Sequence, residues 1–231
     1  MVENRGKNRR APAPRASMRR RSCGGSCPSC KKIAAEGVTL SVDTMRARVA
    51  EAALDAGAHL VNDVSGGLAD AAMVPMVVAT GAPFVVMHWR GFSEDMNARA
   101  VYADVVGEVV SELEQRMAAV VGAGVAPERV LLDPGLGFAK ATEHDLVLLA
   151  HLDRLRALGR PLLVAASRKR FLGRVLAGDT SAAPPPARER DAATAAVSAL
   201  SAAGGAWGVR VHEVRASADA VRVARAVEAA R

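Results

Sequence analysis

Polar side chains recur at the ends of short apolar runs that are typical of buried strands. Asp43, Asn62 and Asp133 each end such a run, and Lys169 follows another. Carboxylate, amide and ammonium groups together offer the acceptors and donors that suit a flat, amide-rich heterocycle. If the runs are neighbouring parallel strands, these groups converge on one pocket. Taken alone, Asp43 is equally well explained as the N-cap of a helix that begins at Thr44.

Two further features indicate an anion site and a close backbone approach. Arg210 and His212 lie two residues apart on one predicted strand, so they point to the same side and could both meet an anion. The segment DPGLGFAK (residues 133–140) leaves a strand through two glycines, which permit a turn beside a ligand. It lacks the Gly-Lys-Ser/Thr ending of a nucleotide loop and the full dinucleotide fingerprint, so we expect no nucleotide cofactor.

The elements that must position these groups alternate regularly from Val38 onward. Strands are predicted over residues 38–43, 59–64, 83–88, 129–133, 161–167 and 207–212. Helices are predicted over residues 44–56, 69–80, 100–121, 143–158, 189–203 and 217–230. Left-handed glycines are expected to close four of these helices, at Gly57, Gly81, Gly122 and Gly159. The polar run at residues 188–191 is expected to be a solvated helix start with local pairing.

Repeated strand and helix units of this length predict parallel strands joined by crossovers, in either an open doubly wound sheet or a closed barrel. An open sheet gathers its functional groups near one switch point, whereas here every predicted strand ends in polar groups. We therefore predict an α/β fold of the TIM (β/α)8 barrel type. The six predicted units are fewer than the eight of a complete barrel.

The N-terminal segment differs sharply from the rest of the 231 residues. Ten of the 31 Lys and Arg residues and all three cysteines, Cys23, Cys27 and Cys30, lie within residues 1–32 with one acid, Glu3. We expect residues 1–30 to be a disordered basic segment and residues 31–231 to be the barrel domain. No apolar run is long enough for a membrane helix, and the body contains no cysteine. These features predict a cytoplasmic protein.

Six motifs carry a resemblance to a known family, the pterin-binding dihydropteroate synthases. They are SVDT (41–44), VNDVSGG (61–67), MH (87–88), LDPGLGFAK (132–140), ASRKRFLG (166–173) and VRVHEV (209–214). All six occur in the family's order, over about residues 31 to 231. Asp43 and the Asn62-Asp63 pair alone are shared with the wider group of pterin-binding methyltransferases.

The resemblance implies that p-aminobenzoate condenses with 6-hydroxymethyl-7,8-dihydropterin pyrophosphate, giving 7,8-dihydropteroate and pyrophosphate for folate biosynthesis. Mg²⁺ would assist the leaving group, and no side-chain nucleophile is expected. The family positions assign the pterin to Asp43, Asn62, Met87, Asp133, Lys169 and Arg210. They assign p-aminobenzoate to Phe138 and Ser167, and pyrophosphate to Arg210 and His212. Family members are usually dimers through their last helices, which implies a homodimer.

The sequence departs from the family at its beginning. The family's first two strands find no match, nor does the Asn-Val-Thr-Pro-Asp-type segment whose Asn helps hold Mg²⁺, so we assign no metal ligand in this chain. A barrel lacking its first two strands has two exposed sheet edges, which destabilise the fold. We therefore expect weak pterin binding and no formation of dihydropteroate by the chain as printed.

Other interpretations lead to different functions. A methyltetrahydrofolate-dependent methyltransferase is the first alternative, and the SRK and RVH motifs argue against it. A non-catalytic fragment with a basic, nucleic-acid-binding tail is the second, but without aromatic interleaving we expect no nucleic-acid partner. Cys23, Cys27 and Cys30 also have the spacing of a radical S-adenosylmethionine iron-sulfur site, with Ser29 where an aromatic is usual. A zinc site would need a fourth ligand, and no His lies nearby.

We predict that the basic segment is out-of-frame text. Back-translated with GC-rich codons and read two bases later, residues 23–30 encode Arg-Arg-Val-Leu-Pro-Val-Val, which resembles the family's stretch before Lys31. Sequencing the locus is expected to reveal an upstream reading frame that contains an Asn-Val-Thr-Pro-Asp-like segment. An upstream region without such a segment would contradict this prediction.

Overall fold

The computed structural model describes residues 33, 36–92, 98–178 and 183–231. The basic segment and its three cysteines lie outside the described residues, so the expectations for residues 1–30 stay predictions. Within the described range, no helix combines the length and the apolar character that a bilayer span requires.

In the part of the chain that the structure describes, six short strands form one consecutive series of parallel neighbours. They are β1 (Ser41–Asp43), β2 (Leu60–Asp63), β3 (Phe84–Met87), β4 (Val130–Asp133), β5 (Leu163–Val164) and β6 (Gly208–Val209). The first four pair in chain order, β5 pairs with β6, and a parallel bridge from Leu132 to Leu162 continues the series between β4 and β5. Strand order that equals chain order is the barrel arrangement, because a doubly wound sheet reverses direction at its switch point. The predicted α/β barrel-type fold is confirmed.

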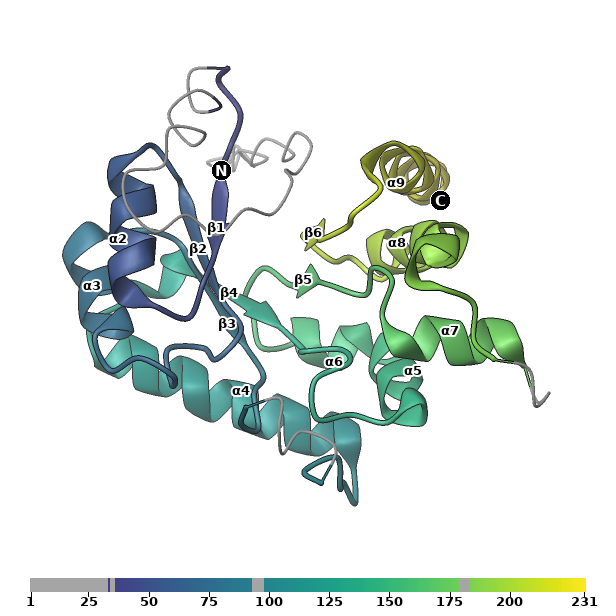
Figure 1. Ribbon diagram of the computed structural model, residues 1–231, viewed down its shortest axis with the longest axis horizontal. Coiled ribbons are helices and arrows are strands. Elements are labelled where there is room, and N and C mark those ends of the chain that lie inside the picture. The colour runs from purple at the N-terminus through teal and green to yellow at the C-terminus, as the bar shows by residue number, and fades with distance from the viewer. Residues whose placement is uncertain (1–32, 34–35, 93–97, 179–182) are drawn as a thin grey trace, which may run out of the picture.

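Helices cover the outer side of the arc that the strands follow (Figure 1). They are α2 (Ala47–Asp55), α3 (Met73–Thr80), α4 (Val105–Gly122), α5 (Thr142–Ala150), α6 (Leu152–Arg156), α7 (Arg170–Ala177), α8 (Asp191–Ala203) and α9 (Val214–Ala229). Short 3-10 turns precede β4 and α8, at Pro127–Arg129 and Ala187–Arg190. Each strand is thus followed by at least one helix, as repeated crossovers require.

Three of the differences between the predicted and the observed elements concern helices and the glycines expected to close them. The helix predicted over residues 143–158 divides into α5 and α6 at His151, whose φ of −120° and ψ of 39° are not helical. Helix α7 was not predicted, because it is only eight residues long and has a narrow apolar face at Phe171 and Leu172. Gly122 belongs to α4, and Gly124, with a φ of 109°, takes the left-handed position instead. The left-handed conformations predicted for the other three glycines are confirmed.

Alternation along the strands divides the apolar residues into two layers. Phe84, Val86 and Leu132 face outward and pack in the large core between sheet and helices. A smaller cluster, here called the inner apolar layer, lies on the other face of the sheet and consists of Val85, Leu131 and Leu163 with Leu60 and Trp207 packed against it. The interior of a barrel is filled with side chains in this way. The inner apolar layer therefore lies directly beneath the carboxyl edge, where barrel proteins place their functional residues.

Gly135 follows β4 at the carboxyl edge, and there is no space for a side chain at its position. Its φ is 67°, and a Cβ atom there would lie 2.4 Å from the carbonyl oxygen of His88. We predict that Gly135→Ala lowers the free energy of unfolding by roughly 3 kcal/mol or more, combining left-handed strain with a backbone clash. Gly81→Ala is the matched control, because Gly81 has a φ of 64° and no atom within 4 Å of an added Cβ. Urea denaturation should show a loss of about 1 kcal/mol for the control, and equal losses would contradict the prediction.

Candidate functional site

Four of the residues predicted to bind the pterin lie at the carboxyl edge of the sheet, one on each of four adjacent strands. Asp43 pairs in register with Asn62, and Met87 pairs with Asp133. Asn62, Met87 and Asp133 each follow a residue of β2, β3 or β4 on the inner face by two positions, so alternation points them to the same side as the inner apolar layer. Asp43 is not the N-cap of α2, a position that Arg46 occupies.

Asn62 presents an acceptor that the surrounding protein leaves unsatisfied. The residue is 5% exposed, and its Oδ1 atom has no hydrogen-bond partner within the described residues. A buried carbonyl oxygen without a donor costs about 1–3 kcal/mol. A ligand with an N–H group at this edge would supply the missing donor, which distinguishes Asn62 from a side chain that only stabilises the fold.

Asp63, the neighbour of Asn62, has a structural role. Its carboxylate is fully buried and accepts hydrogen bonds from the N–H of Ser65 at 2.8 Å, the Ser65 hydroxyl at 2.7 Å and the N–H of Gly67 at 2.9 Å. Burial raises the pKa of Asp63, and these hydrogen bonds oppose the rise. The VNDVSGG motif therefore combines one residue directed to the site with one that holds the turn after β2.

Asp133 is a buried carboxylate at the centre of the edge. It is 2% exposed and accepts the N–H of Gly135 at 2.7 Å. Burial raises the pKa of Asp133, and the positive charge of Lys169 is the largest opposing influence. The carboxylate and the ammonium therefore depend on each other to remain charged away from water.

Lys169 approaches Asp133 from the loop between β5 and α7. Its Nζ atom donates to the carbonyl of Leu136 and lies 4.7 Å from the centroid of the Phe138 ring, a cation–π distance. Burial lowers the pKa of Lys169, whereas Asp133, then Asp145, and also Asp43 raise it. The ammonium thus responds to carboxylates on both sides of the site.

Arg168, directly before Lys169, has a strained backbone. Its φ of 59° is left-handed, which is unusual for a residue other than glycine. Its guanidinium makes two 2.7 Å hydrogen bonds to Asp191, its N–H donates to the Thr194 hydroxyl, and its carbonyl accepts from Arg190 at 3.1 Å. The helix start predicted within residues 188–191 agrees with α8, which begins at Asp191, but the predicted local pairing is wrong, because Arg190 and Asp191 bind Arg168 and hold its turn.

The β6 side of the site closes onto β1 through an ion pair. The Nη2 atom of Arg210 lies 2.6 Å from Oδ2 of Asp43, across the interval between the first and last described strands. Ser167 Oγ lies 2.8 Å from Nδ1 of His212 and also accepts the His212 N–H at 3.1 Å. Strand β6 ends at Val209, so the prediction that Arg210 and His212 share a strand is wrong: both lie in the loop that follows.

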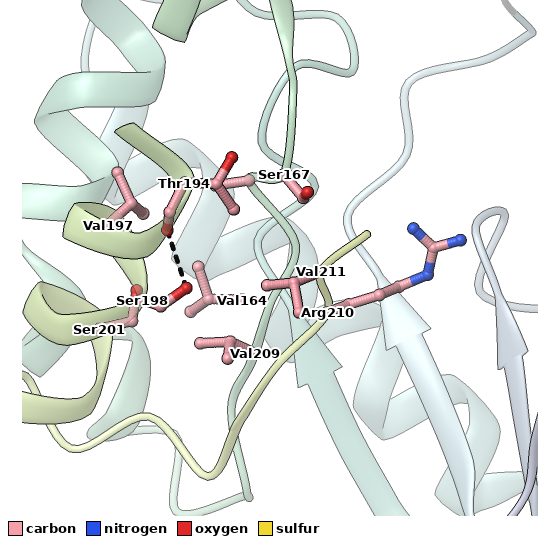
Figure 2. A pocket seen from close by; sticks show the side chains of 10 residues that line it. Val164, Ser167, Thr194, Val197, Ser198, Ser201, Val209, Arg210 and Val211 are labelled. Atoms are coloured by element: carbon pink, nitrogen blue, oxygen red, sulfur yellow. Dashed lines mark hydrogen bonds between the residues drawn. The ribbon is translucent and has the colours of Figure 1, made fainter. Parts of the chain in front are cut away.

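Figure 2 shows that Arg210 points away from the side chains that α8 presents to β5 and β6. That packed region contains Thr194, Ser198 and Ser201, and the Ser198 hydroxyl donates to the Thr194 carbonyl at 2.8 Å. The space between these side chains has no room for a water molecule, and within the described structure Ser201 Oγ has no partner. The region is therefore packed interior between α8 and the sheet, and Arg210 is directed away from it.

A series of polar contacts runs from α4 through the buried His88 to the Gly135–Lys140 loop and supports it. Lys140 Nζ lies 2.9 Å from Nδ1 of His88, and the Nε2 atom of His88 lies 3.0 Å from Glu112 of α4. Burial lowers the pKa of His88 to about 4, and the hydrogen bond from His88 lowers the pKa of Glu112 to about 2. Sequence reasoning missed these roles, because contacts between residues 24 and 52 positions apart leave no local pattern.

The described residues do not form a magnesium site. They contain no cluster of three or more His, Cys, Asp or Glu side chains suited to a metal ion. The carboxylates nearest the edge already face cations, since Asp43 pairs with Arg210, and Lys169 is the main charge opposing the pKa rise of Asp133. Mg²⁺ is usually held by one or two carboxylates together with waters and substrate phosphates, so the described residues alone provide no preformed site for it.

The profile of the family described as pterin binding enzyme matches residues 26–212. The chain is 54% identical over 197 residues to the dihydropteroate synthase of Mycobacterium leprae, a match that covers 85% of this chain and 69% of that protein. The chain belongs to the dihydropteroate synthase family. A second family member, from a Synechocystis species, is 40% identical over 190 residues, covering 82% of this chain and 64% of its own. The chain thus spans about two thirds of the length of these curated relatives.

Solved structures of the family agree with the described fold. The dihydropteroate synthase of Thermus thermophilus in complex with 4-aminobenzoate superposes with a TM-score of 0.77 at 41% identity, covering 87% of this chain and 75% of that one. The enzyme from Xanthomonas albilineans in complex with 7,8-dihydropteroate gives 0.77 at 37% identity, covering 87% and 72%. The family is one of transferases, and the alternative of a methyltetrahydrofolate-dependent methyltransferase is not favoured.

The buried His88 predicts a pH dependence of stability. Because the pKa of His88 is about 4 in the folded chain, below its ordinary 6.5, unfolding takes up a proton between these values. The free energy of unfolding should therefore fall by about 2–3 kcal/mol more in the wild type than in His88→Gln as the pH falls from 7 to 4. His151→Gln, at an exposed histidine, is the control and should keep the wild-type pH dependence. Parallel curves for the wild type and His88→Gln would contradict the assignment.

Proposed function

We propose that this chain carries the substrate-binding edge of a dihydropteroate synthase. The reaction joins p-aminobenzoate to the methylene carbon of 6-hydroxymethyl-7,8-dihydropterin pyrophosphate and releases pyrophosphate. The observation that carries the proposal is the unpartnered, buried Oδ1 of Asn62, aligned in register with Asp43 at an edge that also holds Asp133. An acceptor with no internal donor, next to two carboxylates, suits the N–H groups of an aminopyrimidinone ring.

The pterin would lie across the polar edge above the inner apolar layer. Asn62, Asp43 and Asp133 would accept hydrogen bonds from its ring N–H and amino groups, and Lys169 would donate to its carbonyl or ring nitrogen. Met87, which is 3% exposed beside Asp133, would pack against the ring. Related proteins bind such molecules: the Thermus thermophilus synthase has been solved with 6HMPPP.

Chemistry at this edge would be electrostatic. Cleavage of the carbon–oxygen bond places positive charge on the dihydropterin and negative charge on the departing pyrophosphate. Arg210 has donors beyond the one that Nη2 gives to Asp43, and these with His212 would receive the leaving group, while Asp133 would stabilise the developing cation. These groups are held in position before charge separates, so little reorganisation is required.

The second substrate would approach from the β5 side. Ser167 lies shortly before the first turn of α7, and the Phe138 ring lies beside Lys169. A helix start attracts carboxylates, so p-aminobenzoate would place its carboxylate near Ser167 and its ring against Phe138. The Ser167 hydroxyl is held by His212, which would link this subsite to the pyrophosphate side.

Several family properties stay predictions for this chain. Magnesium is expected from the family, and no step above depends on it. The homodimer, the cytoplasmic location and the boundary between residues 1–30 and 31–231 are likewise expectations from the sequence.

Removing the Asn62 acceptor tests the proposal without damaging the fold. Asn62→Leu should weaken binding of 6-hydroxymethyl-7,8-dihydropterin pyrophosphate at least about tenfold, because a ligand N–H loses its acceptor. The free energy of unfolding should stay unchanged or rise by up to about 1 kcal/mol, since no internal hydrogen bond of Oδ1 is lost. Ligand-observed NMR titration measures the weak affinities expected, and urea denaturation measures stability.

Ser201→Ala is the matched control for Asn62→Leu. Ser201 Oγ is the other buried side-chain atom without a partner in the described structure, and it lies behind the sheet. Its replacement should affect stability similarly and leave pterin affinity unchanged. Equal pterin affinities for the wild type and Asn62→Leu would refute the proposed function.

A further inference from the structure

Lys140 occupies a buried position where its ammonium is fully used by the protein. The residue is 7% exposed, and Nζ lies 2.9 Å from His88 Nδ1, 3.2 Å from the Gly135 carbonyl and 3.1 Å from the Phe138 carbonyl. An ammonium group has three N–H donors and no acceptor, so these three partners satisfy it completely. Lys140 therefore has no donor left for a substrate.

The other contacts of His88 determine the direction of its hydrogen bond to Lys140. Glu112 Oε2 lies 3.0 Å from Nε2 of His88, and a carboxylate only accepts, so Nε2 carries the proton. The Nδ1 atom of a neutral imidazole is then an acceptor that faces Lys140. Arg90 holds Glu112 in place with further hydrogen bonds, and its guanidinium stacks 3.9 Å from the Tyr102 ring centroid. Glu112 on α4 thus orients the ammonium of Lys140 through His88.

The backbone groups of the 135–140 loop are held by this ammonium and by two other side chains. Asp145 accepts the N–H of Gly137 at 2.7 Å, and the Tyr102 hydroxyl donates to the Ala139 carbonyl at 3.0 Å. Ala139 has a φ of 47°, a left-handed conformation that a residue other than glycine adopts only when its surroundings impose it. The ammonium of Lys140 and two side chains from outside the loop, Asp145 and Tyr102, therefore impose one conformation on it.

The fixed conformation of the loop places groups that the proposed function needs. The Leu136 carbonyl accepts from Lys169, and the Phe138 ring lies 4.7 Å from the same ammonium. Gly137 lies against the Lys169 side chain, where an added Cβ would come within 2.9 Å of Cδ. Movement of the loop would therefore displace Lys169 and Phe138 together.

We propose that Lys140 is a positioning residue, oriented by Glu112 through His88, that fixes the Gly135–Phe138 turn and thereby sets the positions of Phe138 and Lys169. The consequence for substrates rests on the proposed function, whereas the positioning role is a property of the free protein. Burial lowers the pKa of Lys140 to about 7, with Asp145 and Asp133 opposing the shift and Lys169 and Arg90 adding to it. The three acceptors around Nζ favour its charged form.

Hydrogen exchange of the ligand-free chain tests the positioning role. In Lys140→Met, amides of residues 134–141 should exchange at least about tenfold faster than in the wild type, while those of residues 60–67 keep their protection. Arg174→Met, at an exposed cation of α7, is the matched control and should change neither segment. Unchanged exchange in residues 134–141, or equal acceleration in both segments, would overturn the proposal.

A substitution on α4 tests the chain of contacts without removing a buried charge. Glu112 has a side chain that is 37% exposed, so Glu112→Gln should fold normally. A Gln side chain can accept from Nε2 or donate to it, and it lacks the negative charge of Glu112, so the ring proton is no longer confined to Nε2 and reaches Nδ1 opposite Lys140 in part of the molecules. Exchange in residues 134–141 should then rise severalfold. Glu108→Gln is the control, because Glu108 also binds Arg90 but takes part in none of the hydrogen bonds described for His88.

The ¹⁵N resonances of His88 in the wild type give a reading that needs no variant. The proposal expects the proton on Nε2, and a proton on Nδ1 would overturn it. The two proposals fail separately: a flexible loop in Lys140→Met without pterin binding by the wild type supports positioning and refutes the substrate assignment. Unchanged loop exchange in Lys140→Met, together with loss of pterin affinity in Asn62→Leu, would refute the positioning role and support the substrate assignment.

Discussion

The site depends on mutual neutralisation of ionised groups that are removed from water. Asp133, Lys140 and Asp145 are each less than a tenth exposed, and burial shifts the pKa of all three toward the neutral form. Each shift is opposed by charges on other strands or loops, because an isolated buried charge is strongly unfavourable. The positions of the carboxylates and the lysines are therefore linked, and no one of them can be described without the others.

Both lysines of the site follow a residue with a left-handed backbone. Ala139 precedes Lys140 with a φ of 47°, and Arg168 precedes Lys169 with a φ of 59°. Such strain of about 1–3 kcal/mol persists only where the surroundings impose it. Tyr102 holds the first turn from outside the barrel, and Asp191 holds the second. The loop before α4, through Tyr102, and the first residue of α8, Asp191, thus contribute to the site by constraining two turns.

Local sequence patterns predicted the strands and the residues at their ends. The apolar runs that end in Asp43, Asn62 and Asp133 were sufficient to locate three strands. A buried parallel strand with a polar residue at its end can be recognised from a few consecutive residues. The supports could not be predicted in this way. Asp191 lies 23 positions from Arg168, and Glu112 lies 24 positions from His88, so only the folded chain brings them together. The strand end predicted at His212 was wrong because β6 pairs only over Gly208 and Val209.

The ion pair between Arg210 and Asp43 also bears on the order of folding. It joins residues 167 positions apart, whereas each backbone pairing between strands joins neighbours along the chain. Contacts of large sequence separation pay the greatest loop-closure entropy and form late. A nascent chain would therefore pair the described strands one after another and only then bring β1 and the loop after β6 into contact. The capacity to engage a ligand across that interval would be acquired at the end of folding.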